Sequence, residues 1–296
     1  MNVLEELSTA NETKSVPAVE VDALAALGQK YQLLSYHIPY LKEFARVVDA
    51  RGKDVLEVGG AMPHEIVIDH LGCNSWTATE SPQYDEELGI ANQQTLLMGL
   101  NSRGAGNRSR YRTLLKNVEE FDSAEHGQYD VIFSIACFEH IARFPQALDA
   151  MYRCLRPGGV LFSMYSPLWS SLRGHHLFHV DIPSRFDPAR TDGQILLPWE
   201  HLLKNRLELY QELQKRFDRE FACEVVYQVF NSQHINRYHT EDFARFVADS
   251  PFTVRQMFAS YRAPMPEGYQ AALERACPGY TQFDNQGIYL LLEKTA

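Results

Sequence analysis

The order of hydrophobic and polar residues predicts strands and helices that alternate along most of the chain. Residues 128–135 are nearly all apolar after Asp130, which is typical of a strand covered on both faces in a parallel sheet. Residues 55–58 form a similar run that one acid, Glu57, interrupts, and residues 75–80 alternate between apolar and polar side chains. The strand candidates are residues 55–58, 75–80, 110–117, 128–135, 159–167, 252–261 and 287–293.

Apolar residues at helical spacing separate these segments. Residues 21–48 predict two helices ahead of the first strand, and Pro63 suits the first turn of a helix that Gly72 can end. A helix after the fourth strand ends at residues 156–159, where a proline and two glycines interrupt it, and Thr240 can cap a helix before the sixth strand. Strands that alternate with helices predict an α/β fold with a parallel sheet.

A glycine turn follows the first strand and gives the first indication of function. Gly59 and Gly60 let the backbone turn and approach a ligand where a side chain would intrude. Strand, glycine turn and helix together form a βα unit of the kind that binds nucleotides. Glu80 ends the next strand, about 20 residues beyond the turn, where an acid can accept hydrogen bonds from both hydroxyls of a ribose.

Three motifs resemble those of the class I S-adenosylmethionine-dependent methyltransferases. Residues 57–63, EVGGAMP, resemble the family's first motif, acid-x-Gly-x-Gly-x-Gly, with Ala61 and Pro63 in place of its second and third glycines. Residues 136–141, ACFEHI, resemble the fourth motif, and residues 155–159, LRPGG, precede the fifth strand as they do in that family. The resemblance implies a doubly wound, mostly parallel seven-stranded sheet whose last strand is antiparallel.

The resemblance, which covers residues 53–165, implies S-adenosylmethionine as the cofactor. It places the cofactor at the carboxyl ends of the strands, against the glycine turn, the ribose-binding acid, an amide beside the adenine and the end of the fourth strand. A NAD-binding domain is a poorer match, because residues 59–61 do not supply its G-x-G-x-x-G motif. The implied cofactor residues are Glu57, Gly59, Gly60, Ala61, Glu80, Asn117, Val118, Ile135 and Ala136.

The chain divides into three parts. Residues 1–52 form an N-terminal helical segment, and residues 53–165 and 238–296 form the Rossmann-like core that binds the cofactor. Residues 166–237 are inserted after the fifth strand, where the resemblance places them over the methyl-donor end of the cofactor. We therefore expect a helical lid that shapes the acceptor site. Apolar residues at helical spacing within residues 203–217 predict a lid helix or a dimer face.

The insertion is rich in histidine, and three interpretations of residues 174–181 stay open. His175 and His179 are four residues apart and could bind a divalent metal if the segment is helical. One histidine could instead be the base that removes a proton from the acceptor, because an unperturbed pKa of about 6.5 suits that role. His176 and His179 are the first candidates for this base, and His175 is the next. The third interpretation is polar lid structure, and no metal ligand is assigned.

Other residues are expected to contact the acceptor. Aromatic side chains could form the walls of its site, or they could form the core of the lid. The N-terminal helices could cover the mouth of the site, or they could only pack on the sheet. The candidates for acceptor contacts are Tyr31, His140, Trp169, Trp199, His201 and His234.

Charge and composition narrow the class of partner. The net charge of −10 argues against a protein that binds nucleic acid, which needs a basic surface. Five cysteines without paired spacing indicate reduced thiols in a cytoplasmic protein. No apolar segment approaches the roughly 20 residues that span a bilayer, and the first residues do not resemble a signal peptide.

The sequence therefore predicts a cytoplasmic enzyme, monomeric or homodimeric, that methylates an oxygen or nitrogen of a small-molecule acceptor. A hydroxyl acceptor needs a nearby base, and the histidines of the insertion can supply one. Two alternatives stay open. One is a methyltransferase that acts on protein or RNA, and the other is a regulatory protein that binds S-adenosylmethionine or a nucleotide without catalysis, which the altered glycine motif favours.

Overall fold

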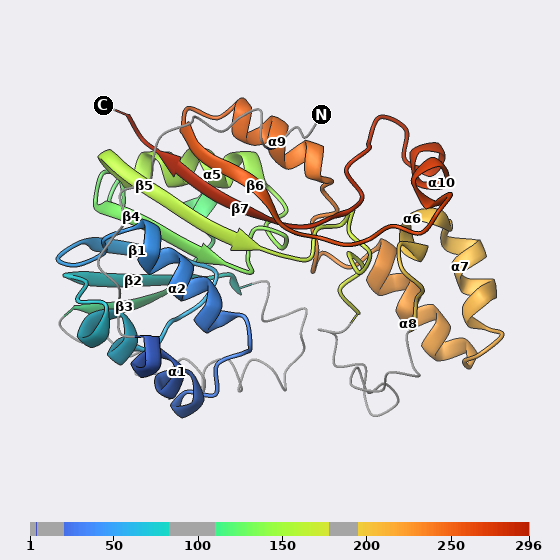
Figure 1. Cartoon of the computed structure of the whole chain (residues 1–296), viewed down its shortest axis with the longest axis horizontal. Coiled ribbons are helices and arrows are strands. Elements are labelled where there is room, and N and C mark those ends of the chain that lie inside the picture. Colours follow the sequence, from blue (N-terminus) through green and yellow to red (C-terminus); the bar gives the residue numbers. More distant parts are fainter. Residues whose placement is uncertain (1–3, 5–20, 83–109, 178–194, 296) are drawn as a thin grey trace.

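The computed structural model of the chain describes residue 4 and residues 21–82, 110–177 and 195–295. Within these residues, seven strands form one sheet in the order β3-β2-β1-β4-β5-β7-β6 (Figure 1). Six of these strands run in the same direction, and only β7 runs in the opposite one. This arrangement confirms the predicted doubly wound, mostly parallel sheet. The strands are β1 (Asp54–Val58), β2 (Ser75–Glu80), β3 (Tyr111–Leu115), β4 (Tyr129–Ile135), β5 (Leu155–Tyr165), β6 (Thr253–Arg262) and β7 (Asn285–Glu293).

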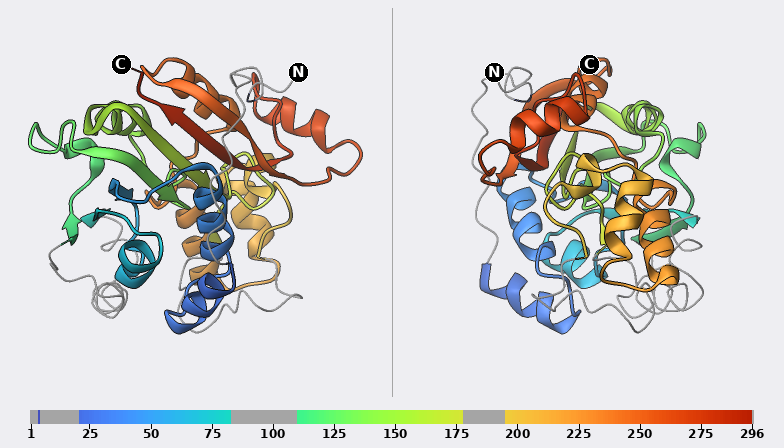
Figure 2. Two further views of the ribbon diagram at one scale, coloured as in Figure 1. Left: turned by 60° about the vertical axis from the view of Figure 1, so that its left-hand side comes forward. Right: turned by 90° about the vertical axis from the view of Figure 1, so that its right-hand side faces the viewer.

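Helices cover both faces of the sheet, as Figures 1 and 2 show. This explains why the central strands are apolar on both sides, since neither face meets water. The elements that pack on one face are α1 (Val21–Lys30), α2 (His37–Val47) and the π-helix η2 (Glu65–His70). The elements that pack on the other face are α5 (Phe144–Cys154), α9 (Thr240–Ala248) and the 3₁₀-helix η3 (Val118–Glu120).

Buried aromatic rings join these layers. Phe44 of α2 packs against Phe133 of β4 and Phe162 of β5, with ring centroids 4.8 and 5.4 Å away. On the opposite face, the ring centroids of Phe144 in α5 and Phe243 in α9 lie 5.1 Å apart. Each fully buried ring of this kind stabilises the fold by about 1.5–3 kcal/mol.

The start of the fifth strand is one boundary that the sequence predicted wrongly. β5 begins at Leu155, so residues 155–159 belong to the strand and do not form a loop before it. Leu155 pairs with Tyr129 and Val160 with Val131, so the register shifts and the strand bulges between these pairs. The proline and glycines end α5 as expected, but the chain extends at once into the sheet.

Two helices also differ from the prediction, one in its first residue and the other in its length. Thr240 is the first residue of α9 rather than its cap, because His239 precedes the helix and donates its N–H to the carboxylate of Asp242 (3.0 Å). The single helix expected over residues 203–217 is broken, because the side chain of Asn205 caps a new helix. The helices outside the sheet layers are α6 (Glu200–Leu203), α7 (Arg206–Leu213), α8 (Arg219–Phe230) and α10 (Tyr269–Ala276).

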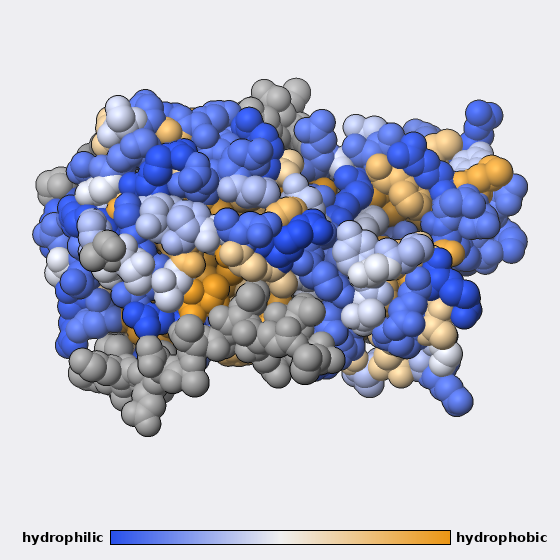
Figure 3. Space-filling model, turned by 90° about the horizontal axis from the view of Figure 1, so that it is seen from above, coloured by the Kyte–Doolittle hydropathy of each residue, from blue (hydrophilic) through white to orange (hydrophobic). Residues whose placement is uncertain are grey.

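The described part of the insertion has its own apolar core, separate from the two layers on the sheet. Its buried members are Trp169, Leu177, Ile195, Leu196, Leu209, Leu213, Phe221, Ala222, Val225, Val229 and Ile235. Hydrophilic residues cover most of the face seen from above, with hydrophobic residues in limited patches (Figure 3). Among the described helices, none has the length and apolar character needed to cross a membrane.

Candidate active site

Five parallel strands, β1 to β5, end at the same edge of the sheet, so the segments that follow them meet there. The predicted cofactor residues lie at or just beyond the ends of β1, β2, β3 and β4, and the insertion follows β5. In Figure 1 the arrowheads of β4 and β5 point toward the insertion. The edge therefore brings the two predicted parts of the site together.

The acid of the first motif holds the glycine turn in shape. Glu57 is buried, and its carboxylate accepts hydrogen bonds from the backbone N–H of Met62 (2.8 Å) and the indole N–H of Trp76 (2.6 Å). The first bond closes the turn onto the strand that precedes it, and the second ties it to β2. Hydrogen bonds to an ionised group are the stronger kind, so Glu57 fixes the backbone that would face the cofactor.

The glycine turn lies directly against the segment that follows β4. Gly59 has a φ of +79°, and a Cβ atom built on it would lie 2.0 Å from Sγ of Cys137. A side chain at this position therefore meets both a strained backbone and an occupied space. Gly60 and Ala61 complete the turn, and Ala61 is buried. The structure thus adds a packing reason for glycine at residue 59 that the motif alone did not give.

Glu80 occupies the end of β2, as predicted for a ribose-binding acid. It is half-buried, and its Oε1 accepts a hydrogen bond from the N–H of Ser81 (2.9 Å). Burial raises the pKa of the Cys137 thiol well above its usual value, and the negative charges of Glu80 and Glu139 add to this rise. The charge of Glu80 therefore acts close to the glycine turn, and acids surround the segment after β4.

Removing the carboxylate of Glu80 should weaken S-adenosylmethionine binding by about 1.5–3 kcal/mol, the range for a hydrogen bond to a charged group. Glu80→Ala should therefore raise the dissociation constant by about 10- to 150-fold in calorimetry. Glu267→Ala, which removes an exposed glutamate from the loop before α10, is the control and should keep wild-type affinity. Equal affinities for wild type and folded Glu80→Ala would exclude the ribose role.

The remaining predicted cofactor residues lie at the ends of β3 and β4. Asn117 follows β3, while the Val118 side chain is buried in the core, which leaves only its backbone for an adenine. Ile135 is the buried last residue of β4. Ala136 has a φ of +47°, and its N–H donates to the carbonyl oxygen of Met164 (2.9 Å). This left-handed residue turns the chain sharply out of the strand.

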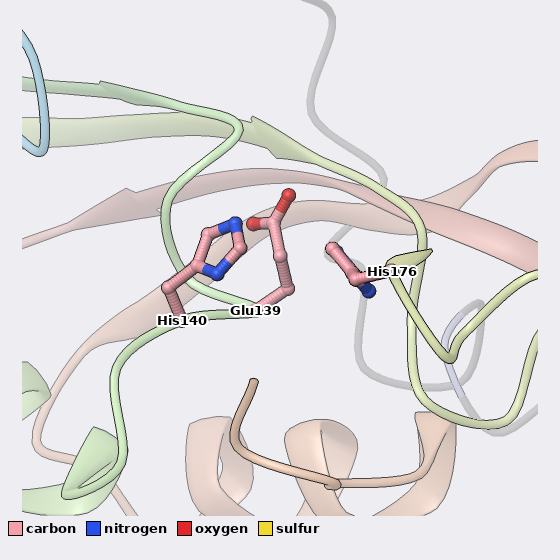
Figure 4. Close-up of side chains that lie close together, drawn as sticks. All are labelled: Glu139, His140 and His176. Atoms are coloured by element: carbon pink, nitrogen blue, oxygen red, sulfur yellow. The ribbon is translucent and has the colours of Figure 1, made fainter. Parts of the chain in front are cut away.

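An acid and three histidines gather just beyond β4 and β5. Glu139 and His140 follow β4, His176 comes from the start of the insertion, and His234 comes from the segment before α9. One ligand atom from each of Glu139, His140 and His176 lies within 4.8 Å of the other two. In Figure 4 the carboxylate of Glu139 lies between the two imidazole rings. The ring of His234 is 4.7 Å from that of His140, centroid to centroid.

Glu139 is a buried carboxyl in an unusual environment. Only 1% of it is exposed, and burial raises its pKa to about 8, although hydrogen bonds from its own N–H and that of Ser166 act in the opposite direction. No described residue forms a hydrogen bond with its Oε2 atom. Tyr40 of α2 reaches the same place, since its hydroxyl lies 3.3 Å from Oγ of Ser166. Burial raises the pKa of Tyr40, and the charge of Glu139 raises it further.

The histidines that were predicted from the sequence separate into two groups. His176 lies with His140 and His234 beside Glu139, with a φ of +54° at His176 itself. His175 turns the other way and packs against residues of the insertion. His179 lies outside the described residues. Of the three candidate bases, the structure thus places His176 beside the acid.

The other predicted acceptor residues are held in structural contacts. The hydroxyl of Tyr31 donates to the carboxylate of Glu65 in η2 (2.5 Å). Trp169 belongs to the apolar core of the insertion, and the indole N–H of Trp199 donates to two backbone carbonyls. A ring nitrogen of His201 bonds to the carbonyl of Trp169 (2.8 Å). Among the predicted acceptor residues, only His140 and His234 lie in the cluster around Glu139.

The buried histidines of the insertion should make the protein less stable in acid. Burial lowers the pKa of His201 to about 4 and lowers those of His175 and His239 as well. Between pH 6.5 and 4 the unfolded chain binds a proton at His201 that the folded chain does not, so stability falls as the pH falls. This residue alone should cost about 3 kcal/mol of unfolding free energy at pH 4.

Urea unfolding of wild type and His201→Gln across this range checks the effect, because glutamine can keep a bond to the carbonyl of Trp169. The variant should lose less stability than wild type between pH 6.5 and 4, and the two should run in parallel above pH 7. Identical slopes below pH 6.5 would show that His201 is protonated in the folded chain.

Sequence reasoning did not assign a role to three residues that the structure brings to this edge. Glu139 lies in the fourth motif, and its position soon after an apolar strand could have identified it as a site residue. Tyr40 offered only helical spacing, which does not reveal what a side chain on α2 touches. Cys137 gave no signal, because its contact with Gly59 joins segments far apart in the chain.

Comparison with known proteins identifies the family to which the chain belongs. A family model described as a methyltransferase domain matches residues 31–257, and the chain belongs to this family. No curated protein matches the sequence. The structure is similar to an S-adenosylmethionine-dependent methyltransferase from Mesorhizobium loti, with 10% identity, a TM-score of 0.44, and coverage of 94% of this chain and 98% of that chain. It is also similar to phosphoethanolamine N-methyltransferase 2 from Haemonchus contortus in complex with S-adenosyl-L-methionine, with 13% identity, a TM-score of 0.49, and coverage of 93% and 57%.

The chain is thus a class I methyltransferase with S-adenosylmethionine as its cofactor. When bound, this cofactor supplies a methyl group already activated on a sulfonium. The residues present fit such a group: the turn at Gly59 carries no side chain, Glu80 can accept from ribose hydroxyls, and the acids near Cys137 suit a cationic centre. The protein must mainly hold donor and acceptor in line and exclude water.

Proposed function

We propose that this methyltransferase acts on an oxygen or nitrogen of a small-molecule acceptor, which binds beside Glu139, His140 and His176. The observation that carries the proposal is the burial of this cluster: Glu139 and His176 are each only 1% exposed. A buried site suits an acceptor that the insertion can cover, and it suits a long RNA or protein chain poorly. The net charge of −10 also counts against RNA.

The chemistry of the cluster supports an acceptor that must lose a proton. A hydroxyl or a protonated amine releases a proton when it is methylated, and a carboxyl or an imidazole close by can take it. Only the ionised form of Glu139 can take this proton, and its raised pKa of about 8 makes that form a stronger base than an ordinary carboxylate. The ionised fraction grows as the pH rises toward 8, so the rate should rise over the same range. His176, from the insertion, is the second candidate for this role, and residues 166–237 thereby become the acceptor-binding region.

Methyl-labelled S-adenosylmethionine tests the proposal. The protein is incubated with the labelled cofactor and an extract of its own cells that has been separated into small molecules, protein and RNA. Label should appear in the small-molecule fraction and should depend on Glu139. Label in protein or RNA would favour the alternative acceptors, and tight cofactor binding without any transfer would favour a regulatory protein.

A further inference from the structure

We propose that Glu139, His140 and His176 bind one divalent transition-metal ion at the acceptor side of the site. The three residues offer one carboxylate oxygen and two imidazole nitrogens, all within 4.8 Å of one another. Two nitrogen ligands and one oxygen suit zinc, cobalt, manganese or iron better than magnesium or calcium, which prefer oxygen ligands. These residues are not the pair His175 and His179, which the sequence offered as possible metal ligands.

The two imidazoles are oriented for this role by backbone carbonyls. Nδ1 of His140 lies 2.5 Å from the carbonyl oxygen of His234, and Nδ1 of His176 lies 3.0 Å from that of Gly174. A ring nitrogen that faces a carbonyl carries the proton, so Nε2 of each ring carries the lone pair. Metal-binding histidines are typically held in this way, with the second ring nitrogen donating to a carbonyl or carboxylate.

The carboxylate has an oxygen available for an ion. Glu139 is buried, and among the described residues nothing forms a hydrogen bond with its Oε2 atom. A buried carboxylate is costly unless a cation or hydrogen-bond donors offset its charge. Backbone N–H groups of Glu139 and Ser166 bond to the carboxyl, which leaves a divalent cation as a fitting partner for the remaining oxygen.

The geometry needs only a small contraction to bind an ion. Ligands about 2.1 Å from a tetrahedral ion lie about 3.4 Å apart, so the three atoms would move closer on binding. His176, with its φ of +54°, lies within the inserted segment. Three protein ligands leave at least one position open, which is typical of catalytic rather than structural sites. An acceptor oxygen or nitrogen could occupy that position.

Cobalt binding by the full chain tests this inference without any acceptor. After treatment with a chelator and dialysis, wild type should bind one Co²⁺ per chain in calorimetry and should show the visible absorption bands of cobalt bound by histidine. Glu139→Gln and His176→Ala should each weaken Co²⁺ binding by at least about 10- to 100-fold. His126→Ala, in the loop before β4, is the matched control and should bind as wild type does.

Circular dichroism spectra and melting temperatures of the metal-free variants show whether each is folded. If Glu139→Gln or His176→Ala does not fold, His140→Gln replaces it in the test of Co²⁺ binding. Absence of saturable Co²⁺ binding by wild type would overturn the inference, and so would wild-type affinity in the folded ligand variants. This inference goes beyond the proposed function, and it makes Glu139 and His176 ligands in place of proton acceptors while an ion is bound. A chain that binds Co²⁺ but methylates protein or RNA would contradict the proposed function and leave the metal site in place.

Discussion

Glu139→Gln should lower the turnover of methyl transfer by about 10²–10⁴-fold, the range for loss of a proton-accepting group. Glutamine keeps the size of the side chain and can still accept a hydrogen bond from the N–H of Ser166, but it cannot take up a proton at neutral pH. Affinity for S-adenosylmethionine should change only a few-fold, because the glycine turn follows β1 and Glu80 ends β2, whereas Glu139 follows β4.

Single-turnover rates with the labelled cofactor measure this effect separately from binding. Glu267→Gln, a change of the same kind on the loop before α10, should keep the wild-type rate. If Glu139→Gln is folded and turns over within a few-fold of wild type, Glu139 neither takes the proton nor holds the acceptor. His176 would then remain as the candidate base.

Gly59→Ala should lower the free energy of unfolding by about 2–5 kcal/mol and abolish S-adenosylmethionine binding. The left-handed backbone costs a residue with a Cβ about 1–2 kcal/mol, and overpacking costs about 1–3 kcal/mol more. The second cost arises from Cys137, whose Sγ would lie 2.0 Å from the added carbon. Because one of the two segments must move, the turn loses the shape that the cofactor requires.

Gly127 supplies a matched control for this prediction. Its φ is +63°, but a Cβ built there meets no atom within 4 Å, so Gly127→Ala should cost only the backbone part. Combining Gly59→Ala with Cys137→Gly should recover part of the loss, and a double-mutant cycle measures that coupling. If Gly59→Ala and Gly127→Ala lose equal stability in urea, the contact with Cys137 contributes nothing to the cost of a side chain at residue 59.

The sheet was predictable because its signals are local. An apolar run such as β4 must be covered on both faces, and a glycine turn followed by a helix defines a βα unit, so a doubly wound, mostly parallel sheet was expected. The boundary of β5 was missed because residues 155–159 look like a helix end, and only pairing with Tyr129 shows that they join the sheet. A local sequence pattern does not reveal which residues of two separate strands pair.

The site was predictable only in part, because it depends on which way side chains turn. Adjacent residues His175 and His176 look alike in the sequence, yet the left-handed backbone at His176 places its ring toward Glu139. Its neighbour points into the insertion beside His201. The contribution of Tyr40 depends on how α2 lies across the sheet. These relations arise from tertiary packing, which no spacing rule expresses.

The separate apolar core of the insertion has a consequence for how such an enzyme can diversify. The residues that stabilise the insertion, among them Leu209, Leu213 and Val225, belong to a cluster that shares no buried member with the clusters on the sheet. Substitutions inside it can reshape the proposed acceptor-binding region while leaving the strands of the sheet intact. Selection for a new acceptor can therefore change the residues of the insertion while binding of S-adenosylmethionine stays unchanged.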